Sequence, residues 1–290
     1  MNRFLRTATA LGVFALAVSG YCWDDTGHMV IAAIAEDRLS QHAYDECTKL
    51  LAVGGTDKTK GFVAAACWAD DTKNKTTGPW HYIDIPFRTD GKPTQTKPAE
   101  ENVVWAINHF SDILKDKTKP EADRADALRY LIHFVGDVHQ PLHAVTMESD
   151  EHPNGDRGGN DFPIKTDDLF TSMQNPPTNL HSLWDMGAGL FVPHFVSRPL
   201  NPESLAKIHI LGQDLVAKFP TTVFKGEMLN DLNPKDWADE SNATAQNIVY
   251  KVRTGGEIDL LYVTTAKTIA GGRAALAGYR LAALLNKLLP

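Results

Sequence analysis

The sequence has little of what marks several protein classes. Of its 290 residues only three are cysteine, and its 21 glycines and 16 prolines are scattered along the chain. This scatter excludes a collagen-like or low-complexity chain, and no repeat of about 20 to 50 residues is visible. With 22% charged and 43% hydrophobic residues, the composition argues against a disordered or multi-span membrane protein. It predicts a globular chain with a substantial core.

A hydrophobic run long enough to cross a bilayer is also missing near the N-terminus. The apolar stretch Thr7–Gly20 has 14 residues, whereas a spanning helix needs about 20. Because it follows a short basic start, this stretch predicts a secretory signal peptide over residues 1–22, cleaved after Cys22. Trp23 would then begin a single mature domain, residues 23–290, of a secreted or periplasmic protein.

The chain has no surplus of positive charge. Its formal net charge is −7, and loss of residues 1–22 removes two arginines and no acid, which makes it −9. A protein that holds nucleic acid by electrostatics alone should be basic. If this chain handles phosphate groups, something other than lysine and arginine must supply the positive field.

Two cysteines, Cys47 and Cys67, remain in the mature chain. In an exported protein they could form one disulfide, and closing the loop between them would stabilise the fold by about 3 kcal/mol. Two buried free thiols are the alternative.

Hydrophobic periodicity is mainly helical. Apolar residues recur at helical spacing over Val103–Leu114, Ile208–Phe219 and Ala277–Leu288. Strand-like alternation is confined to His81–Phe87 and Phe162–Thr166. We therefore predict a single, mainly α-helical (all-α) domain with a few short strands. Its long connections should lie near residues 71–100, 144–178 and 220–235.

The densest motif is LIHFVGDVHQPLH. His133 and Asp137 are four residues apart and share one face of a helix. Pro141 should end that helix and let His143 swing back toward the same face, whereas His139 should point away. Because the helix is apolar, an unpaired Asp137 would be costly to bury without a cation. Metal ligation is therefore favoured over a simple surface ion pair.

A second pair repeats this spacing in NLHSLWD, where His181 and Asp185 are four residues apart. Imidazole and carboxylate with almost no thiolate are typical of hydrolytic zinc sites. Asp70 in the tripeptide WAD and His81 at the start of HYIDIPF are further candidate ligands, although each alone would more often be structural.

The new N-terminus is a further candidate. The α-amine and carbonyl oxygen of Trp23 can chelate a metal in a five-membered ring, and His28, near a helix start, could complete the site. Metal binding easily displaces the amine proton. This hypothesis makes signal cleavage part of activation.

The order of these motifs resembles that of the S1/P1 nuclease family. W-x4-H, WAD, HY-x-D, H-x3-D-x5-H, GGND and NLHSLWD follow one another, and AGYRLAALLNKLL looks like the family's last helix. The resemblance implies a phospholipase C/nuclease-type fold and a secreted, zinc-dependent, single-strand-specific nuclease and 3′-nucleotidase.

The resemblance also implies three Zn²⁺. It assigns one to Asp70, His81, His133 and Asp137, a second to His143, His181 and Asp185, and a third to Trp23, His28 and the shared Asp137. Six positive charges against three carboxylates would draw phosphate to an otherwise anionic protein.

The remaining functional residues follow from the same resemblance. Asp70 would orient the attacking water, and Lys73, where the family has arginine, would contact phosphate. Tyr82 would stack on a base and Asp84 would bind its edge, the alternatives being a strand packing residue and a turn cap. Asn160 lies in the GGN element, where backbone amides could face phosphate.

We thus expect hydrolysis of single-stranded DNA and RNA to 5′-phosphate products, and release of phosphate from 3′-nucleotides. The protein should be a monomer with no membrane partner. A zinc phospholipase C is the alternative enzyme, and a zinc-storage module without catalysis is the alternative from another class.

Overall fold

The computed structural model describes residues 23–166, 169–192 and 196–290. The predicted signal peptide, residues 1–22, lies outside the described residues, as does its cleavage site at Cys22.

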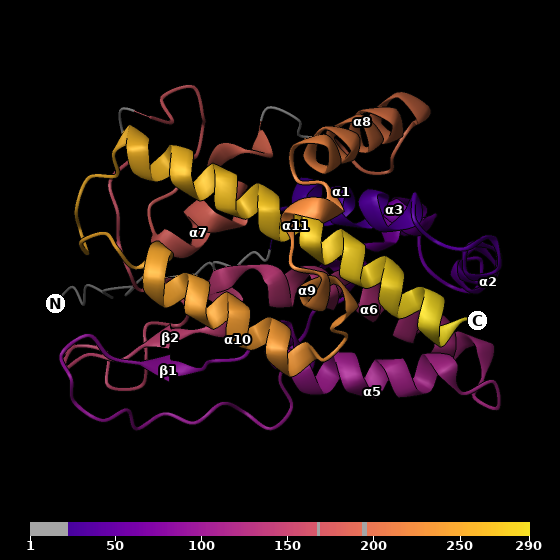
Figure 1. Cartoon of the computed structure of the whole chain (residues 1–290), viewed down its shortest axis with the longest axis horizontal. Coiled ribbons are helices and arrows are strands. Elements are labelled where there is room, and N and C mark those ends of the chain that lie inside the picture. The colour runs from indigo at the N-terminus through magenta and orange to yellow at the C-terminus, as the bar shows by residue number, and fades with distance from the viewer. Residues whose placement is uncertain (1–22, 167–168, 193–195) are drawn as a thin grey trace, which may run out of the picture.

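The described chain is mainly helical, as predicted (Figure 1). Its α-helices are α1 (Asp25–Glu36), α2 (Gln41–Leu51), α3 (Phe62–Ala65), α4 (Trp68–Asp71), α5 (Val103–Lys115), α6 (Glu121–His139), α7 (Leu180–Asp185), α8 (Pro202–Lys218), α9 (Gly226–Asn230), α10 (Pro234–Thr244) and α11 (Leu260–Leu288). Short 3₁₀ turns that matter for the site are η2 (Gly78–His81), η3 (Pro141–Ala144) and η4 (Gly187–Gly189).

The three helices predicted from periodicity are confirmed as α5, α8 and the second half of α11. Asn102 caps α5 by accepting hydrogen bonds from Val104 and Trp105, and α8 ends at Lys218, two residues before Pro220. The predicted long connection over residues 220–235 lies between α8 and α10, but it has some structure of its own. That segment contains α9 and a 3₁₀ turn at Thr221–Val223, elements too short to show a helical period.

The predicted strands are mostly absent from the described chain. Of His81–Phe87 only β1 (Pro86–Phe87) is a strand, and it pairs in parallel with β2 (Thr146–Met147). Phe162–Thr166 makes only isolated bridges, at Pro163 and at Lys165. Other backbone segments pair with each of them at one or two positions only. The alternation of apolar and polar residues therefore reflects which side chains are buried, and not a continuous strand.

Helix α11 connects the two hydrophobic cores. Its first half packs in one core with Trp23, Trp184 and Phe191, and its second half packs in the other with Phe134 and Trp237. In Figure 1 it runs across the whole molecule, over α1 and α6. Helix α1 contributes to both cores as well, so α1 and α6 meet where the cores join.

The cysteines do not form the predicted disulfide. Cys47 and Cys67 are both buried free thiols. Cys47 lies in the core around α6, whereas Cys67 lies in the other core, where its thiol donates to the carbonyl of Asp25 at 3.7 Å. Because the two side chains belong to different cores, the alternative of two free thiols is the correct one.

Within the described chain, every helix is too short or too polar to span a lipid bilayer.

Candidate metal centre and substrate pocket

One buried carboxylate, Asp137 of α6, lies at the middle of four imidazole rings. Its Oδ2 is 3.0 Å from Nδ1 of His81 and 3.1 Å from Nε2 of His133. Its Oδ1 is 3.4 Å from Nε2 of His28 and 3.4 Å from Nδ1 of His143. The side chain of Asp137 is fully buried. The shared helix face predicted for His133 and Asp137 is thus confirmed, and it faces the interior.

The local sequence explains how these rings converge. Helix α6 ends at His139, and η3 begins at Pro141, so the chain turns and returns His143 to the centre as predicted. His28 enters from α1, where Gly136 gives it room. A Cβ at Gly136 would lie 3.0 Å from Nδ1 of His28.

His139 points away, as predicted. Its Nδ1 donates to the carbonyl of Val135 at 2.7 Å, and its Nε2 faces Arg280 at 3.0 Å.

Three groups of side chains could each hold a metal ion, with ligand atoms within 4.8 Å of one another. They are Asp70, His81 and His133; His143, His181 and Asp185; and His28, His133 and Asp137. The side chain of Asp70, in α4, is 24% exposed, so its carboxylate is accessible to solvent. Its oxygens lie 3.6 Å from His81 Nδ1 and 3.7 Å from His133 Nε2.

The second group is built on α7 and η3. His181 Nε2 lies 3.4 Å from Asp185 Oδ2, and His143 Nε2 lies 3.7 Å from Asp185 Oδ1. Gln140, which sequence reasoning missed although it sits inside the HQPLH motif, donates to Asp185 at 2.8 Å. It therefore fixes one candidate ligand of this group from the end of α6.

Backbone carbonyls orient several of the rings. Nδ1 of His133 lies 2.6 Å from the carbonyl of Ala66, and Nδ1 of His181 lies 2.7 Å from that of Gly158. Because a carbonyl only accepts, each Nδ1 carries a proton, which leaves Nε2 as the nitrogen that could bind a metal. This arrangement is typical of metal-bound histidine, whose other nitrogen donates to a carbonyl or carboxylate.

Several buried polar atoms at the centre have no hydrogen-bond partner among the described residues. They are both ring nitrogens of His28, Oδ1 of Asp137 and Nε2 of His143. Leaving such atoms unsatisfied costs about 1–3 kcal/mol each, and more for a charged group. A divalent cation would bind the lone pairs of Asp137 Oδ1, of His143 Nε2 and of one ring nitrogen of His28, and nitrogen and oxygen donors suit zinc. The residues present therefore fit the metal ions that the sequence predicts.

The protonation states of Asp137 and His28 also suit a cation. Burial alone would raise the pKa of Asp137, but the charge of His133 and the close approach of the His133, His143 and His28 rings hold that pKa well below its usual range. Burial and the neighbouring His133 lower the pKa of His28. An ionised carboxylate beside a neutral imidazole is the state in which both bind a metal.

Trp23 lies against the centre. Its side chain is buried, and its indole Nε1 donates to the carbonyl of Gly136 at 2.9 Å. The ring meets that of Phe191 edge to face, with 5.6 Å between centroids. The indole of Trp23, five residues before His28, is thus anchored beside Gly136, the residue that precedes Asp137.

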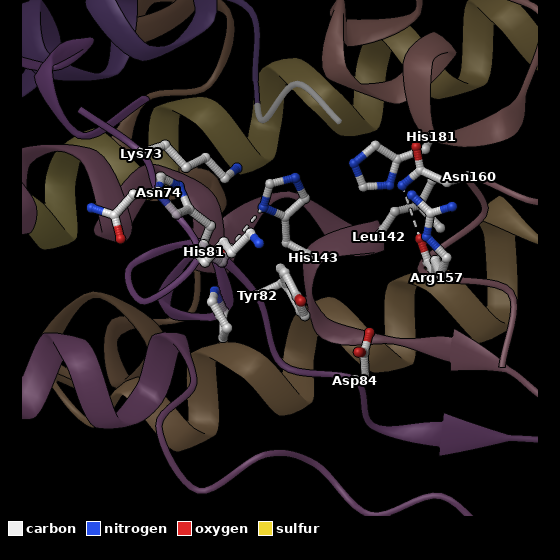
Figure 2. A pocket seen from close by; sticks show the side chains of 13 residues that line it. Lys73, Asn74, His81, Tyr82, Asp84, Leu142, His143, Arg157, Asn160 and His181 are labelled. Carbon is white, nitrogen blue, oxygen red and sulfur yellow. Dashed lines mark hydrogen bonds between the residues drawn. The ribbon is translucent and has the colours of Figure 1, made fainter. Parts of the chain in front are cut away.

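A cavity of about 420 Å³ opens beside these groups. Figure 2 shows His81, His143 and His181 along it, with Lys73 at one end and Asn160 at the other. The predicted substrate residues Lys73, Tyr82, Asp84 and Asn160 all line it. The structure therefore brings together every substrate residue predicted from the sequence and three of the metal-ligand candidates.

Tyr82 and Asp84 form one wall of this cavity. Tyr82 is 39% exposed and lies outside the strand β1, which excludes the alternative of a buried strand residue. Burial raises the pKa of Asp84 from 3.8 to about 6, and the negative charge of Asp156 adds to this effect. An exposed ring beside a carboxyl offers both a stacking surface and a hydrogen-bonding edge.

Lys73 and Asn160 approach the cavity from different loops. Nζ of Lys73 lies 3.6 Å from Oδ1 of Asp70. The amide of Asn160 donates to the carbonyl of Arg157 at 2.9 Å. Arg157 also lines the cavity, and sequence reasoning missed it. The only signal was its place directly before the GGN element.

Comparison with known proteins identifies relatives over the same residues. The sequence model of the S1/P1 nuclease family matches residues 23–290. Endonuclease 3 of Arabidopsis thaliana is 27% identical over 92% of this chain and 89% of its own length. Nuclease P1 of Penicillium citrinum is 27% identical over 92% of this chain and 97% of its own. Nuclease S1 of Aspergillus oryzae is 29% identical over 64% of this chain and 60% of its own.

Proposed function

The chain belongs to the S1/P1 nuclease family, and on this premise we propose that it is a zinc-dependent nuclease of single-stranded DNA and RNA with 3′-nucleotidase activity. One observation supports this most: three groups of histidine and aspartate surround a single buried carboxylate at the edge of a cavity. The cavity has a place for a base and cationic side chains for phosphate.

The proposed ligands are those predicted from the sequence. Asp70, His81, His133 and Asp137 would hold one zinc, His143, His181 and Asp185 a second, and Trp23, His28 and Asp137 a third. When bound, zinc supplies Lewis acidity, which lowers the pKa of water and stabilises negative charge on phosphate oxygens.

Asp70 is proposed to orient the attacking water. Of the two carboxylates proposed for the first zinc, Asp70 is partly exposed, whereas Asp137 is fully buried. His133 and His81 lower the pKa of Asp70 against the effect of its burial, so it is ionised and accepts hydrogen bonds at neutral pH. Lys73, 3.6 Å away, would donate to a phosphate oxygen.

Tyr82 and Asp84 are proposed to bind the base of the nucleotide that carries the scissile 3′-phosphate. Stacking on an aromatic ring is worth about 1–3 kcal/mol per base. A base must leave its helical stack to reach this wall, and a duplex resists that by a few kcal/mol. Preference for single strands follows. Asn160 would donate its side-chain amide to phosphate from the far end.

Hydrolysis assays test the proposal against its alternatives. Single-stranded DNA, the same sequence as a duplex, 3′-AMP and a phosphatidylcholine analogue are compared on protein beginning at Trp23. We expect phosphate from 3′-AMP and cleavage of the single strand well above that of the duplex. Activity on the lipid alone would make the protein a phospholipase C, and zinc binding without hydrolysis would make it a storage module.

A further inference from the structure

The loop around Arg157 is held firmly on both sides. Asp156 before it is fully buried and accepts hydrogen bonds from the amide of Met147 at 2.9 Å and from the hydroxyl of Tyr250 at 2.8 Å. Gly158 after it accepts from the Nδ1 of His181 at 2.7 Å. The backbone of Arg157 is therefore fixed relative to the centre.

Arg157 occupies a conformation that usually belongs to glycine. Its φ is 57°, and Gly158 and Gly159, which follow, have φ of 61° and 81°. A bulky residue in this left-handed region is uncommon and is a reason to look for a function. A glycine would fit the backbone of residue 157 more easily, so the side chain itself needs an explanation.

That side chain faces the cavity. It is 67% exposed and lines the cavity together with Tyr82 and Asp84. Burial raises the pKa of both Tyr82 and Asp84, and the positive charge of Arg157 opposes this rise in each. In Figure 2, Arg157 and Lys73 lie on opposite sides of His143.

We propose that Arg157 binds the 5′-phosphate of the nucleotide whose base contacts Tyr82 and Asp84. The proposal rests on the proposed function, which places the 3′-phosphate of that nucleotide beside the metal ligands and Lys73. The sugar then directs its 5′ oxygen away from Lys73, toward the side of the cavity where the guanidinium lies. A guanidinium donates two parallel hydrogen bonds to phosphate.

The guanidinium can take a phosphate at little cost. Its partner is Asp161, whose Oδ1 lies 3.3 Å from Nη1, and both side chains are solvent-exposed. Exposed ion pairs of this kind contribute little to stability, so a phosphate group can replace Asp161 as the partner of the guanidinium. Arg157 would therefore favour polymers and 5′-phosphorylated nucleotides over nucleotides that carry only a 3′-phosphate.

Two small substrates isolate this contact, because they differ only in the 5′-phosphate. Phosphate release from adenosine 3′,5′-bisphosphate and from 3′-AMP gives a ratio of two kcat/KM values. We expect this ratio to be about tenfold in the wild type, as for a charge-assisted hydrogen bond, and close to one in Arg157→Gln. Arg157→Lys should fall between them. Lys75→Gln, which removes a positive charge from the Lys73 end of the same cavity, should keep the wild-type ratio.

The outcomes separate the two proposals. A wild-type ratio near one, or an unchanged ratio in Arg157→Gln, overturns the role of Arg157 while the nuclease assignment stands. If the wild type hydrolyses neither compound, the proposed function fails. Both compounds are then stable ligands, and the ratio of their dissociation constants, measured by calorimetry, tests Arg157 in the same way.

Salt dependence gives a second measurement, on a polymer. Each phosphate contact to a single strand contributes about 0.7 to the slope of log affinity against log salt concentration. With a 5′-phosphorylated single-stranded oligonucleotide, Arg157→Gln should reduce that slope by about 0.7, whereas an unchanged slope contradicts the proposal. Unfolding temperatures of the variants check that folding is intact.

Discussion

The Oδ1 of Asp137 lies 3.4 Å from the Nε2 of His28. This contact joins the middle of the molecule to the first helix of the described chain, because His28 lies in α1 and Asp137 in α6. The absence of a side chain at Gly136 allows the approach. The segment that signal cleavage would expose is thus part of the candidate metal centre.

Replacing Asp137 by asparagine should empty more than one metal position, since its carboxylate contacts rings from all three groups. We expect at most one zinc per chain and a loss of activity of about 100-fold or more. Zinc content, measured by mass spectrometry of the purified variant, checks this. The matched control is His139→Gln, on the same buried helix but facing Arg280, which should keep all its zinc. Full zinc content in Asp137→Asn would refute the central role of this carboxylate.

Arg198 ties together two segments that carry proposed ligands. Its Nε donates to Asp25 at 2.8 Å, and its Nη1 and Nη2 donate to Asp71 at 2.6 and 2.8 Å. Asp25 is two residues from Trp23, and Asp71 is adjacent to Asp70. Arg198→Met should therefore release zinc to a chelator about tenfold faster, as loss of an outer-shell partner does.

A second arginine provides the control for this prediction. Arg88 also bridges two aspartates, Asp90 and Asp150, but neither is next to a proposed ligand. Arg88→Met removes the same kind of ion pair and should leave zinc release unchanged. Equal rates of release from the two variants would show that Arg198 has no special effect on the centre.

The pKa of Asp84 predicts a pH-dependent choice of base. With a pKa of about 6, Asp84 is a neutral acid that donates and accepts below that pH, and a carboxylate that only accepts above it. Guanine presents two donors on its Watson–Crick edge, whereas adenine presents one donor and one acceptor. The ratio of kcat/KM for 3′-GMP over 3′-AMP should therefore rise about tenfold as the pH increases through 6.

The ratio of two nucleotides removes pH effects that both share, including those on the metal ligands. In Asp84→Asn the ratio should not change with pH. A wild-type ratio that is flat between pH 5 and 7, about one unit on either side of the pKa, would contradict the role of Asp84 at the base edge.

An extra residue before Trp23 should impair the third zinc site, because it converts the chelating amine into an amide without a basic lone pair. We expect the zinc content to fall from three to two per chain and the activity to fall strongly. The same residue added after Pro290 should have no effect. Full activity and zinc content in the N-terminally extended protein would argue against ligation by the amine.

The two histidine–aspartate pairs could be predicted from the residues because their signals are local, whereas Asp70 and His81 were assigned through the family resemblance. His133 and Asp137, like His181 and Asp185, show their common helix face through their spacing, and the apolar residues around them indicate burial. Residues whose environment depends on distant segments could not be predicted in this way. Gln140 matters because Asp185 lies beside it, and Arg157 because its loop is anchored to Tyr250 and His181.

The wrong predictions have the same cause. Cys47 and Cys67 could pair only if their side chains met, but they lie in separate cores. The strand predicted over Phe162–Thr166 needed a continuous partner strand, and folding supplies only isolated bridges. Sequence periodicity reports burial of a face and does not report which segment covers it.

The central claim is that three zinc ions, held around Asp137, replace a basic surface and carry out hydrolysis. Anomalous scattering at the zinc edge, from crystals of protein that begins at Trp23, tests it most directly. We predict three peaks, one at each of the three groups, with two of them sharing Asp137. A single peak, or peaks away from Asp137, would contradict the account.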